Sequence, residues 1–225
     1  MRQLFVLICT LFCLSGFSQK ADQRNALFTV RGNIGIPKAI SSNMFRTSFA
    51  GLYETNLSLN LRLFDNMYMG IGYQNTHFQN NKFLKQQIFN ASIPYNTRLM
   101  GHGVFFKLGY DQFFSEKGYV SYSLNSGYML CNYLNVNADT TASNRPYPPI
   151  KFSAPYLQPE VSVNLIVEGN MCFSFLLSYT TLFSRFDAKA PRFNQFSEIR
   201  TASNNYLMSW INFGVGFTVL LNKKK

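Results

Sequence analysis

The chain has 225 residues, enough for one domain or two small ones, and its formal net charge at pH 7 is +11. Its mean hydropathy of -0.06 is close to zero, which by itself is typical of a water-soluble protein. Two other values argue against that class. Aromatic residues make up 16% of the chain, and charged residues make up only 14%, against about 25% in typical soluble domains. The composition therefore favours a protein wall that faces lipid on one side, whose polar interior dilutes the hydropathy average.

Residues 1–18 have the pattern of a secretory signal peptide. Arg2 supplies the positive start, and the apolar run at residues 4–14 is shorter than the roughly 20 residues that a membrane-spanning helix needs. Gly16 and Ser18 place small residues three and one positions before a cut that would precede Gln19. We therefore expect export of residues 19–225 as a single mature domain. A retained N-terminal anchor is the alternative.

Residues 26–36 alternate between apolar and polar side chains, as in a strand with one face toward lipid and one toward water. Pro37 ends this predicted strand, because proline has no N–H for the sheet ladder. Residues 51–76 then predict a hairpin that turns at residues 64–66. Its apolar face is too long for an ordinary solvent-facing sheet and is typical of a barrel wall with lipid outside and a polar lumen. That face carries Tyr53, Thr55, Leu57, Leu59, Leu61, Leu63, Met67, Met69, Ile71 and Tyr73.

Five further alternating segments are predicted, at residues 100–113, 119–134, 154–167, 171–183 and 206–221. Pro159 interrupts the third of these, so we expect a bulge there or a strand that starts later. Tight turns are expected at residues 115–118 and 168–170. Long connections are expected at residues 37–50, 78–99, 135–152 and 184–204, with turn signals at residues 80–81 and 93–96.

Short and long connections alternate along the chain, as they do in transmembrane barrels with short periplasmic turns and longer outer loops. No later stretch has 18 consecutive apolar residues, which excludes a helical membrane protein after the leader. The predicted fold is all-β, an eight-stranded antiparallel transmembrane β-barrel in up-and-down meander order. It would lie in the outer membrane with both termini periplasmic. A secreted lipocalin-like binding barrel is the alternative, and its apolar side chains would point inward.

The export signal and the alternating last strand, residues 211–221, carry a resemblance to a known group. The mature chain resembles the small eight-stranded outer-membrane barrels of the OmpX- and OmpA-like group. It is also similar to the outer-membrane β-barrel proteins of Bacteroidota, including those related to PorT. The likeness is architectural and implies a location more than an activity.

The polar face of the strands carries five charged residues, which we assign to a charge network in the lumen: Arg31, Glu54, Arg62, Lys107 and Glu160. An eight-stranded barrel has room inside only for side chains or one small ligand, and an unpaired buried charge is costly. We expect Glu54 and Glu160 to share Arg31 as counter-ion in the outer half, with Lys107 below them. Arg62 should be partly solvated at the periplasmic mouth. The lumen would then be plugged by polar side chains; a polar pocket or proton path is the alternative.

The long connections are basic, with eleven cations against Asp139, Asp187 and Glu198, a balance of 11 − 3 = +8. Facing outward, this charge would contact lipopolysaccharide phosphates, which arginine binds in a bidentate manner and lysine as a point charge. A merely hydrated loop surface is the alternative, and export argues against nucleic-acid binding. The candidate phosphate contacts are Lys38, Arg46, Lys82, Lys85, Arg98, Arg145, Lys151, Arg185, Lys189, Arg192 and Arg200.

No catalytic, cofactor or metal motif is found. His77 and His102 lie near predicted outer strand ends without the serine spacing of outer-membrane lipid A deacylases. Cys131 and Cys172 fit neither a disulfide framework nor a metal motif. We therefore expect a non-enzymatic membrane protein that contacts outer-membrane lipid, lipopolysaccharide or an outer-membrane protein partner. An outer-leaflet lipid A hydrolase that uses His102 is the alternative.

Overall fold

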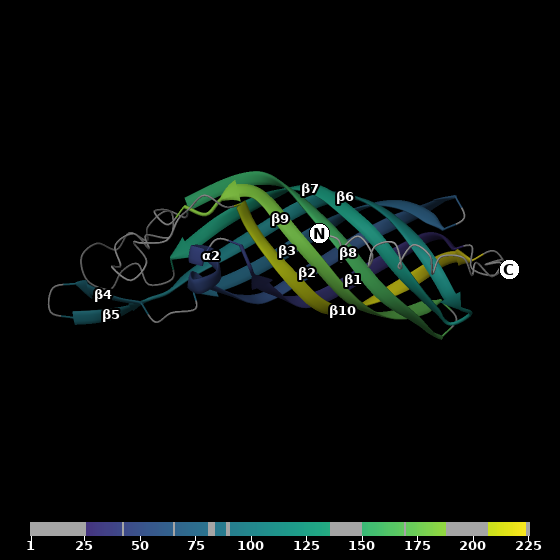
Figure 1. Ribbon diagram of the computed structural model, residues 1–225, viewed down its shortest axis with the longest axis horizontal. Coiled ribbons are helices and arrows are strands. Elements are labelled where there is room, and N and C mark those ends of the chain that lie inside the picture. Colours follow the sequence, from purple (N-terminus) through teal and green to yellow (C-terminus); the bar gives the residue numbers. More distant parts are fainter. Residues whose placement is uncertain are drawn as a thin grey trace, which may run out of the picture.

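The computed structural model describes residues 26–41, 43–64, 66–80, 84–88, 91–135, 150–168, 170–187 and 207–223. Eight of its strands close into a barrel with the order β1-β10-β9-β8-β7-β6-β3-β2, and β1 pairs with both β2 and β10 (Figure 1). Every neighbouring pair is antiparallel, so the predicted barrel fold with meander order is confirmed. The strands are β1 (Ala26–Ala39), β2 (Phe49–Phe64), β3 (Met67–Asn80), β6 (Thr97–Ser115), β7 (Gly118–Asn135), β8 (Ile150–Glu168), β9 (Met171–Arg185) and β10 (Leu207–Lys223).

The alternation of side chains along each strand separates an apolar exterior from a polar interior. Large apolar residues face outward, with exposed fractions of 65% for Ile71, 64% for Val104 and 63% for Phe213. Polar residues of the other parity are buried, including Asn60 and Thr180. The lipocalin-like alternative requires the opposite arrangement and does not fit this wall.

The two ends of the barrel differ. One end holds the short connections β2–β3, β6–β7 and β8–β9, and we call it the turn end. The other, the loop end, carries the short helix α2 (Asn43–Ser48) and a separate hairpin of β4 (Leu84–Ile88) and β5 (Ala91–Tyr95), which projects away from the barrel (Figure 1). In the described part of the chain, no helix has the length and hydropathy needed to cross a bilayer.

The turn signal at residues 93–96 was wrong, because most of this segment belongs to β5. Ile93 pairs with Gln86 and Pro94 with Lys85. In a two-stranded hairpin both strands are edges, so a proline can point its missing N–H away from its partner. The same reasoning corrects the prediction that Pro37 ends the first strand.

Strand β1 continues past Pro37 to Ala39, and Pro37 pairs with Asn212 of β10. On its other side, β1 pairs with β2 only as far as Gly35, opposite Glu54. Pro37 therefore lies where β1 has a single partner, and its missing N–H interrupts no second ladder.

Pro159 causes neither a bulge nor a late start, so both expectations were wrong. Strand β8 begins at Ile150, and Pro159 pairs with Leu124 of β7 without a register shift. On the β9 side, the pairing passes from Leu157 with Thr181 to Glu160 with Ser178 and leaves out the two residues between them. The cost of the proline is this local gap in the β8–β9 ladder.

Aromatic side chains fill the lumen at the loop end. Phe45 of α2 is fully buried, and its ring centre lies 5.2 Å from that of Phe78, which is 5.5 Å from Trp210. Phe49, Tyr133 and Phe186 belong to the same cluster. The helix thus brings its own apolar residue down into the barrel mouth instead of leaving it exposed.

We predict that a charged side chain on the apolar exterior will lower the unfolding free energy of the barrel, as it does at lipid-facing sites of membrane barrels. Leu177 lies near the middle of β9 and is 46% exposed. Replacing Leu177 with Arg should cost about 2–4 kcal/mol of unfolding free energy in a bilayer, while Leu177→Ile should cost less than about 1.5 kcal/mol. Urea unfolding in phosphatidylcholine vesicles measures both. An arginine variant as stable as wild type would show that this face does not contact lipid.

Candidate functional site

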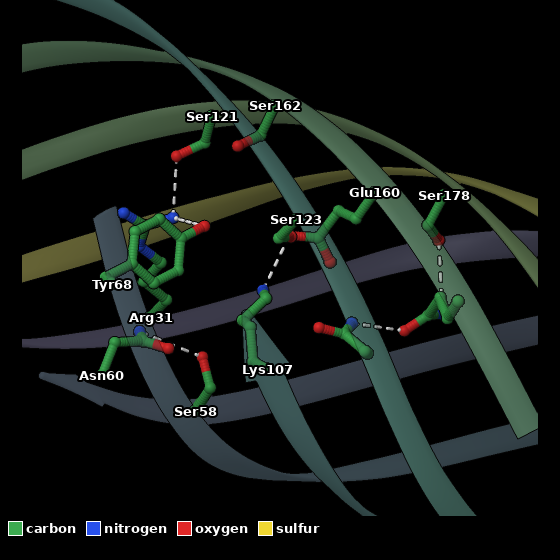
Figure 2. Close-up of polar contacts among 12 residues, drawn as sticks. Arg31, Ser58, Asn60, Tyr68, Lys107, Ser121, Ser123, Glu160, Ser162 and Ser178 are labelled. Atoms are coloured by element: carbon green, nitrogen blue, oxygen red, sulfur yellow. Dashed lines mark hydrogen bonds and ion pairs between the residues drawn. The ribbon is translucent and has the colours of Figure 1, made fainter. Parts of the chain in front are cut away.

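At the turn end of the lumen, two arginines share one carboxylate. Arg31 on β1 places its Nη2 atom 3.1 and 3.0 Å from the two carboxylate oxygens of Asp111, and its Nη1 donates to the hydroxyl oxygens of Tyr68 (2.7 Å) and Ser121 (2.8 Å). Figure 2 shows the contacts of Arg31 with Tyr68 and Ser121. Arg62 on β2 approaches Asp111 at 3.5 Å. Arg31 also lies over the Tyr68 ring, 4.2 Å from its centre. This group joins β1, β2, β3, β6 and β7 across the barrel.

An ion pair spans the middle of the lumen. Lys107 on β6 lies with its Nζ 2.9 Å from Oε1 of Glu160 on β8 (Figure 2). The same carboxylate oxygen accepts a hydrogen bond of 3.5 Å from Ser123. Lys107 and Glu160 are 2% and 5% exposed, so water contributes little to either charge. Such a pair is tolerated at this depth because each group is the other's partner.

Glu54 occupies the lumen nearer the loop end, and its partners are neutral. It is 0% exposed. Its Oε2 accepts from the Trp210 indole (2.6 Å) and the Thr76 hydroxyl (3.2 Å), and its Oε1 accepts from the amides of Gln158 (2.9 Å) and Asn212 (3.2 Å). No cation pairs with Glu54 within the described ranges. Four donors from β3, β8 and β10 take the place of a counter-ion.

The five residues assigned to the lumen from the sequence all lie on the inward parity of their strands. Their predicted pairing was wrong, because Arg31 binds Asp111 and Glu160 binds Lys107. The register gives the reason. Arg31 lies opposite Ser58, whereas Glu54 lies opposite Gly35, four residues further along β1 and therefore about 13 Å away at ~3.3 Å per residue.

Asp111 was not among the residues assigned to the lumen from the sequence, although the strand pattern could have identified it. Asp111 continues the inward parity of Lys107 two positions beyond Gly109, inside a segment already predicted as a strand. Gln158 and Trp210 could have been found in the same way, as inward residues of predicted strands. The partners of Glu54 could not, because they depend on how the strands are staggered around the barrel.

Side chains fill most of the described lumen. The cavities of the described lumen include two of about 10 Å³ each, one beside Thr76 and Trp210 and one beside Arg31 and Glu160. Each has room for about one water molecule. Inward-facing glycines are part of this close packing, since the Tyr156 ring, on the neighbouring part of the wall, covers Gly127 and Gly103.

Four of the predicted phosphate contacts form a set on the outer face of the barrel at its loop end. We call Lys38, Arg98, Lys151 and Arg185 the loop-end cations; they are exposed and lie on β1, β6, β8 and β9. Asp187, just after β9, is the only exposed acid among the described side chains at this end.

The structure places the remaining predicted contacts less completely. Arg46 is exposed on α2. Lys85 lies in β4, where the backbone alone is described. The others lie outside the described residues: Lys82, Arg145, Lys189, Arg192 and Arg200.

Both histidines lie on the outward parity of neighbouring strands. The Nδ1 atom of His102 is 2.7 Å from the Tyr73 hydroxyl, and the His77 ring stacks on Tyr53 with ring centres 4.4 Å apart. No serine hydroxyl contacts either histidine in the part of the chain that the structure describes. Cys131 and Cys172 are buried free thiols.

No protein-family model and no curated protein matches this chain. Among solved structures, a major outer membrane protein from Thermus thermophilus aligns with a TM-score of 0.54 at 9% identity, over 85% of this chain and 97% of that one. Neisserial surface protein A aligns with a TM-score of 0.46 at 16% identity, over 86% of this chain and 97% of that one.

The N-terminal β-barrel domain of Pseudomonas aeruginosa OprF aligns with a TM-score of 0.41 at 10% identity, over 88% of this chain and 99% of that one. At these identities the likeness concerns the fold. The chain has the fold of an outer-membrane β-barrel protein, as predicted. The likeness to proteins related to PorT stays a prediction.

We predict that loss of Asp111 will destabilise the barrel far more than loss of Arg62. Asp111→Ala leaves the buried Arg31 without its carboxylate, which should cost about 3–5 kcal/mol. Arg62→Ala leaves the Arg31–Asp111 pair intact and removes, of the two arginine contacts to Asp111, only the longer one at 3.5 Å, so a loss of about 1 kcal/mol is expected. Urea unfolding in detergent compares them. Equal losses would contradict the assignment of Asp111 as the shared counter-ion.

We also predict that Glu54→Ala will loosen the loop-end half of the lumen. Four buried donors would lose their acceptor, and each unsatisfied group costs about 1–3 kcal/mol. Trp210 is the only tryptophan in the chain, so its fluorescence reports on this site directly. A red-shifted emission and a loss of more than about 3 kcal/mol are expected. Glu54→Gln, which keeps the volume and one acceptor, is the matched control and should lose less. Unchanged emission in Glu54→Ala would contradict the role of Glu54.

Proposed function

We propose that this chain is a non-enzymatic outer-membrane barrel protein whose loop end contacts phosphate groups of lipopolysaccharide in the outer leaflet. In this proposal the turn end faces the periplasm. The lumen holds the wall in shape and conducts nothing, and the protein acts through its outer surface. A protein partner in the same membrane could use that surface as well.

The apolar exterior supports membrane insertion. Each barrel strand has 14 to 19 residues, which exceeds the roughly 9–11 that a tilted strand needs to span a bilayer. Outward tyrosines lie toward both ends of the wall, with Tyr110 and Tyr122 nearer the turns and Tyr73 and Tyr128 nearer the loops. Tyrosine is favoured at such depths because its ring is apolar and its hydroxyl is wet.

The observation that carries the proposal is the set of loop-end cations, which stands directly beyond this apolar wall. Lys38, Arg98, Lys151 and Arg185 come from four strands, of which only β8 and β9 are neighbours. In that position they would meet the head groups of the surrounding leaflet. Each cation near an anionic membrane surface contributes about 1 kcal/mol of attraction.

The lumen supports the part of the proposal that excludes conduction. Ion pairs and the Glu54 site cross the described interior at three depths, and two cavities beside them are of single-water size. A barrel of eight strands has no spare diameter for a channel once these side chains are in place.

We predict that replacing all four loop-end cations with Ser will weaken lipopolysaccharide binding at least tenfold, since about 4 kcal/mol of attraction is removed before screening. Binding is measured in phosphatidylcholine nanodiscs with added lipopolysaccharide. Lys117→Ser, at an exposed position in the β6–β7 turn, is the control and should bind as wild type does. If the quadruple variant also binds like wild type, the proposal fails.

The enzymatic alternative is decided by mass spectrometry of lipid A from cells with and without the protein. The proposal expects identical acylation. An acyl chain that is lost only when His102 is present would overturn the non-enzymatic assignment and favour the hydrolase.

A further inference from the structure

The exterior of the barrel is not uniform, and one side has an open hollow of about 870 Å³ in the apolar wall. Its lining comes from β2, β3, β6 and β7, with Val30 of β1 at one margin. Leu57, Ile71, Val104 and Phe106 border it, and its floor includes Ser126. Ser126 pairs with Phe106 on β6 and with Leu157 on β8, so on the outer face a small side chain stands between two large ones.

Two hydrogen-bonded tyrosines form the edge of the hollow on its loop side. Tyr73 and Tyr128 both pair with Val104, from opposite sides. Tyr73 is bonded to His102 at 2.7 Å, and the Tyr128 hydroxyl is 2.9 Å from Ser153 Oγ. These bonds hold both rings in place and put polar atoms immediately beyond the apolar surface.

Two of the loop-end cations stand above this edge. Arg98 is six residues from Val104 along β6, and Lys151 is four residues from Pro155, the β8 partner of Tyr128. At ~3.3 Å per residue these separations are about 20 and 13 Å along the strands. With a strand tilt of about 40°, they correspond to roughly 10–15 Å along the membrane normal. Because the tyrosines mark the loop-side boundary of the apolar wall, both cations stand beyond that boundary, on the side where the head group of a chain seated in the hollow would lie.

No outward acid opposes Arg98 and Lys151 among the described side chains of their own strands, β6 and β8. The acids there, Asp111 and Glu160, both face the lumen. Just after β9, the neighbour of β8, exposed Asp187 follows Arg185 by two residues. Arg98 and Lys151 are therefore available to attract an anionic head group.

We infer that this hollow seats one fatty acyl chain of a phosphorylated glycolipid, whose phosphate is held by Arg98 and Lys151. The inference rests on the proposed function and makes it specific, because the contact with lipopolysaccharide would occur at one defined binding site. The tyrosine hydroxyls and His102 then face the sugar part of the head group, which offers hydroxyl partners. A second copy of this chain fits less well, because a two-fold contact over the hollow would bring its own Arg98 and Lys151 to the same rim.

Native mass spectrometry of the detergent-solubilised full chain, titrated with bis-phosphorylated lipid A, tests the seat. Ser126 is part of the floor of the hollow, so the larger side chain of Ser126→Phe should occupy the space of the acyl chain. This variant should weaken binding about tenfold or more. Thr181→Phe, an equivalent change on the outer face of β9, should weaken it less than threefold. Heat-modifiable migration on a gel confirms that both variants are folded barrels.

The phosphate arm uses two charge-matched double variants. Arg98→Ser with Lys151→Ser should weaken binding of bis-phosphorylated lipid A at least tenfold and binding of dephosphorylated lipid A less than threefold. Lys38→Ser with Arg185→Ser should change binding of either form of lipid A by no more than threefold.

Two outcomes would overturn the inference of one acyl-chain site while leaving the proposed lipid contact intact. These are equal losses of binding for the two double variants, and unchanged binding by Ser126→Phe. If wild type binds no lipid A at all, the proposed function fails with it. A dimeric mass that Ser126→Phe abolishes would replace the lipid by a second copy.

Discussion

Closure of the sheet between β1 and β10 is the constraint on which the rest of the structure depends. Thirteen pairs, from Ala26 with Lys223 to Ala39 with Trp210, turn a flat meander into a tube without edges. Inside lipid this closure satisfies the backbone polar groups of the wall. It also makes the interior narrow, so the inward side chains must fit one another in both volume and charge.

The charges in the described lumen balance in number but not in position. Arg31, Arg62 and Lys107 face Asp111, Glu160 and Glu54. The turn end holds two arginines with one carboxylate, and the loop-ward layer holds Glu54 with neutral donors. A surplus positive charge therefore lies near the turns, and its compensating negative charge lies near the loops. This separation is tolerable because the Glu54 carboxylate accepts charge-assisted hydrogen bonds from four side chains, those of Trp210, Gln158, Asn212 and Thr76. These donors stabilise the carboxylate, which has no arginine partner in the described part of the chain.

The wall could be predicted from the sequence because its rule is local. A side chain's face follows from its parity alone, so the apolar exterior, the inward charges and the alternating connections could all be predicted without a structure. The pairing of charges across the lumen follows from the stagger of eight strands, which no single segment encodes. That is why Arg31 was assigned to Glu54 when the barrel brings it to Asp111. The strand end predicted at Pro37 and the irregularity predicted at Pro159 were wrong for a related reason. The cost of a missing N–H depends on whether a neighbouring strand would have accepted a hydrogen bond from it.

The gap opposite Pro159 makes the β8–β9 boundary the seam of the tube. The backbone pairing is interrupted there, and the Gln158 side chain crosses the break from the lumen to the hydroxyls of Thr180 (2.8 Å) and Ser178 (3.4 Å). Side-chain bonds replace ladder bonds over this interval, so the amide hydrogens beside it have fewer cooperative partners than those in the uninterrupted part of the same ladder. The Gln158 side chain also donates to the Glu54 carboxylate, so β8 and β9 cannot separate at this gap without disturbing the Glu54 site.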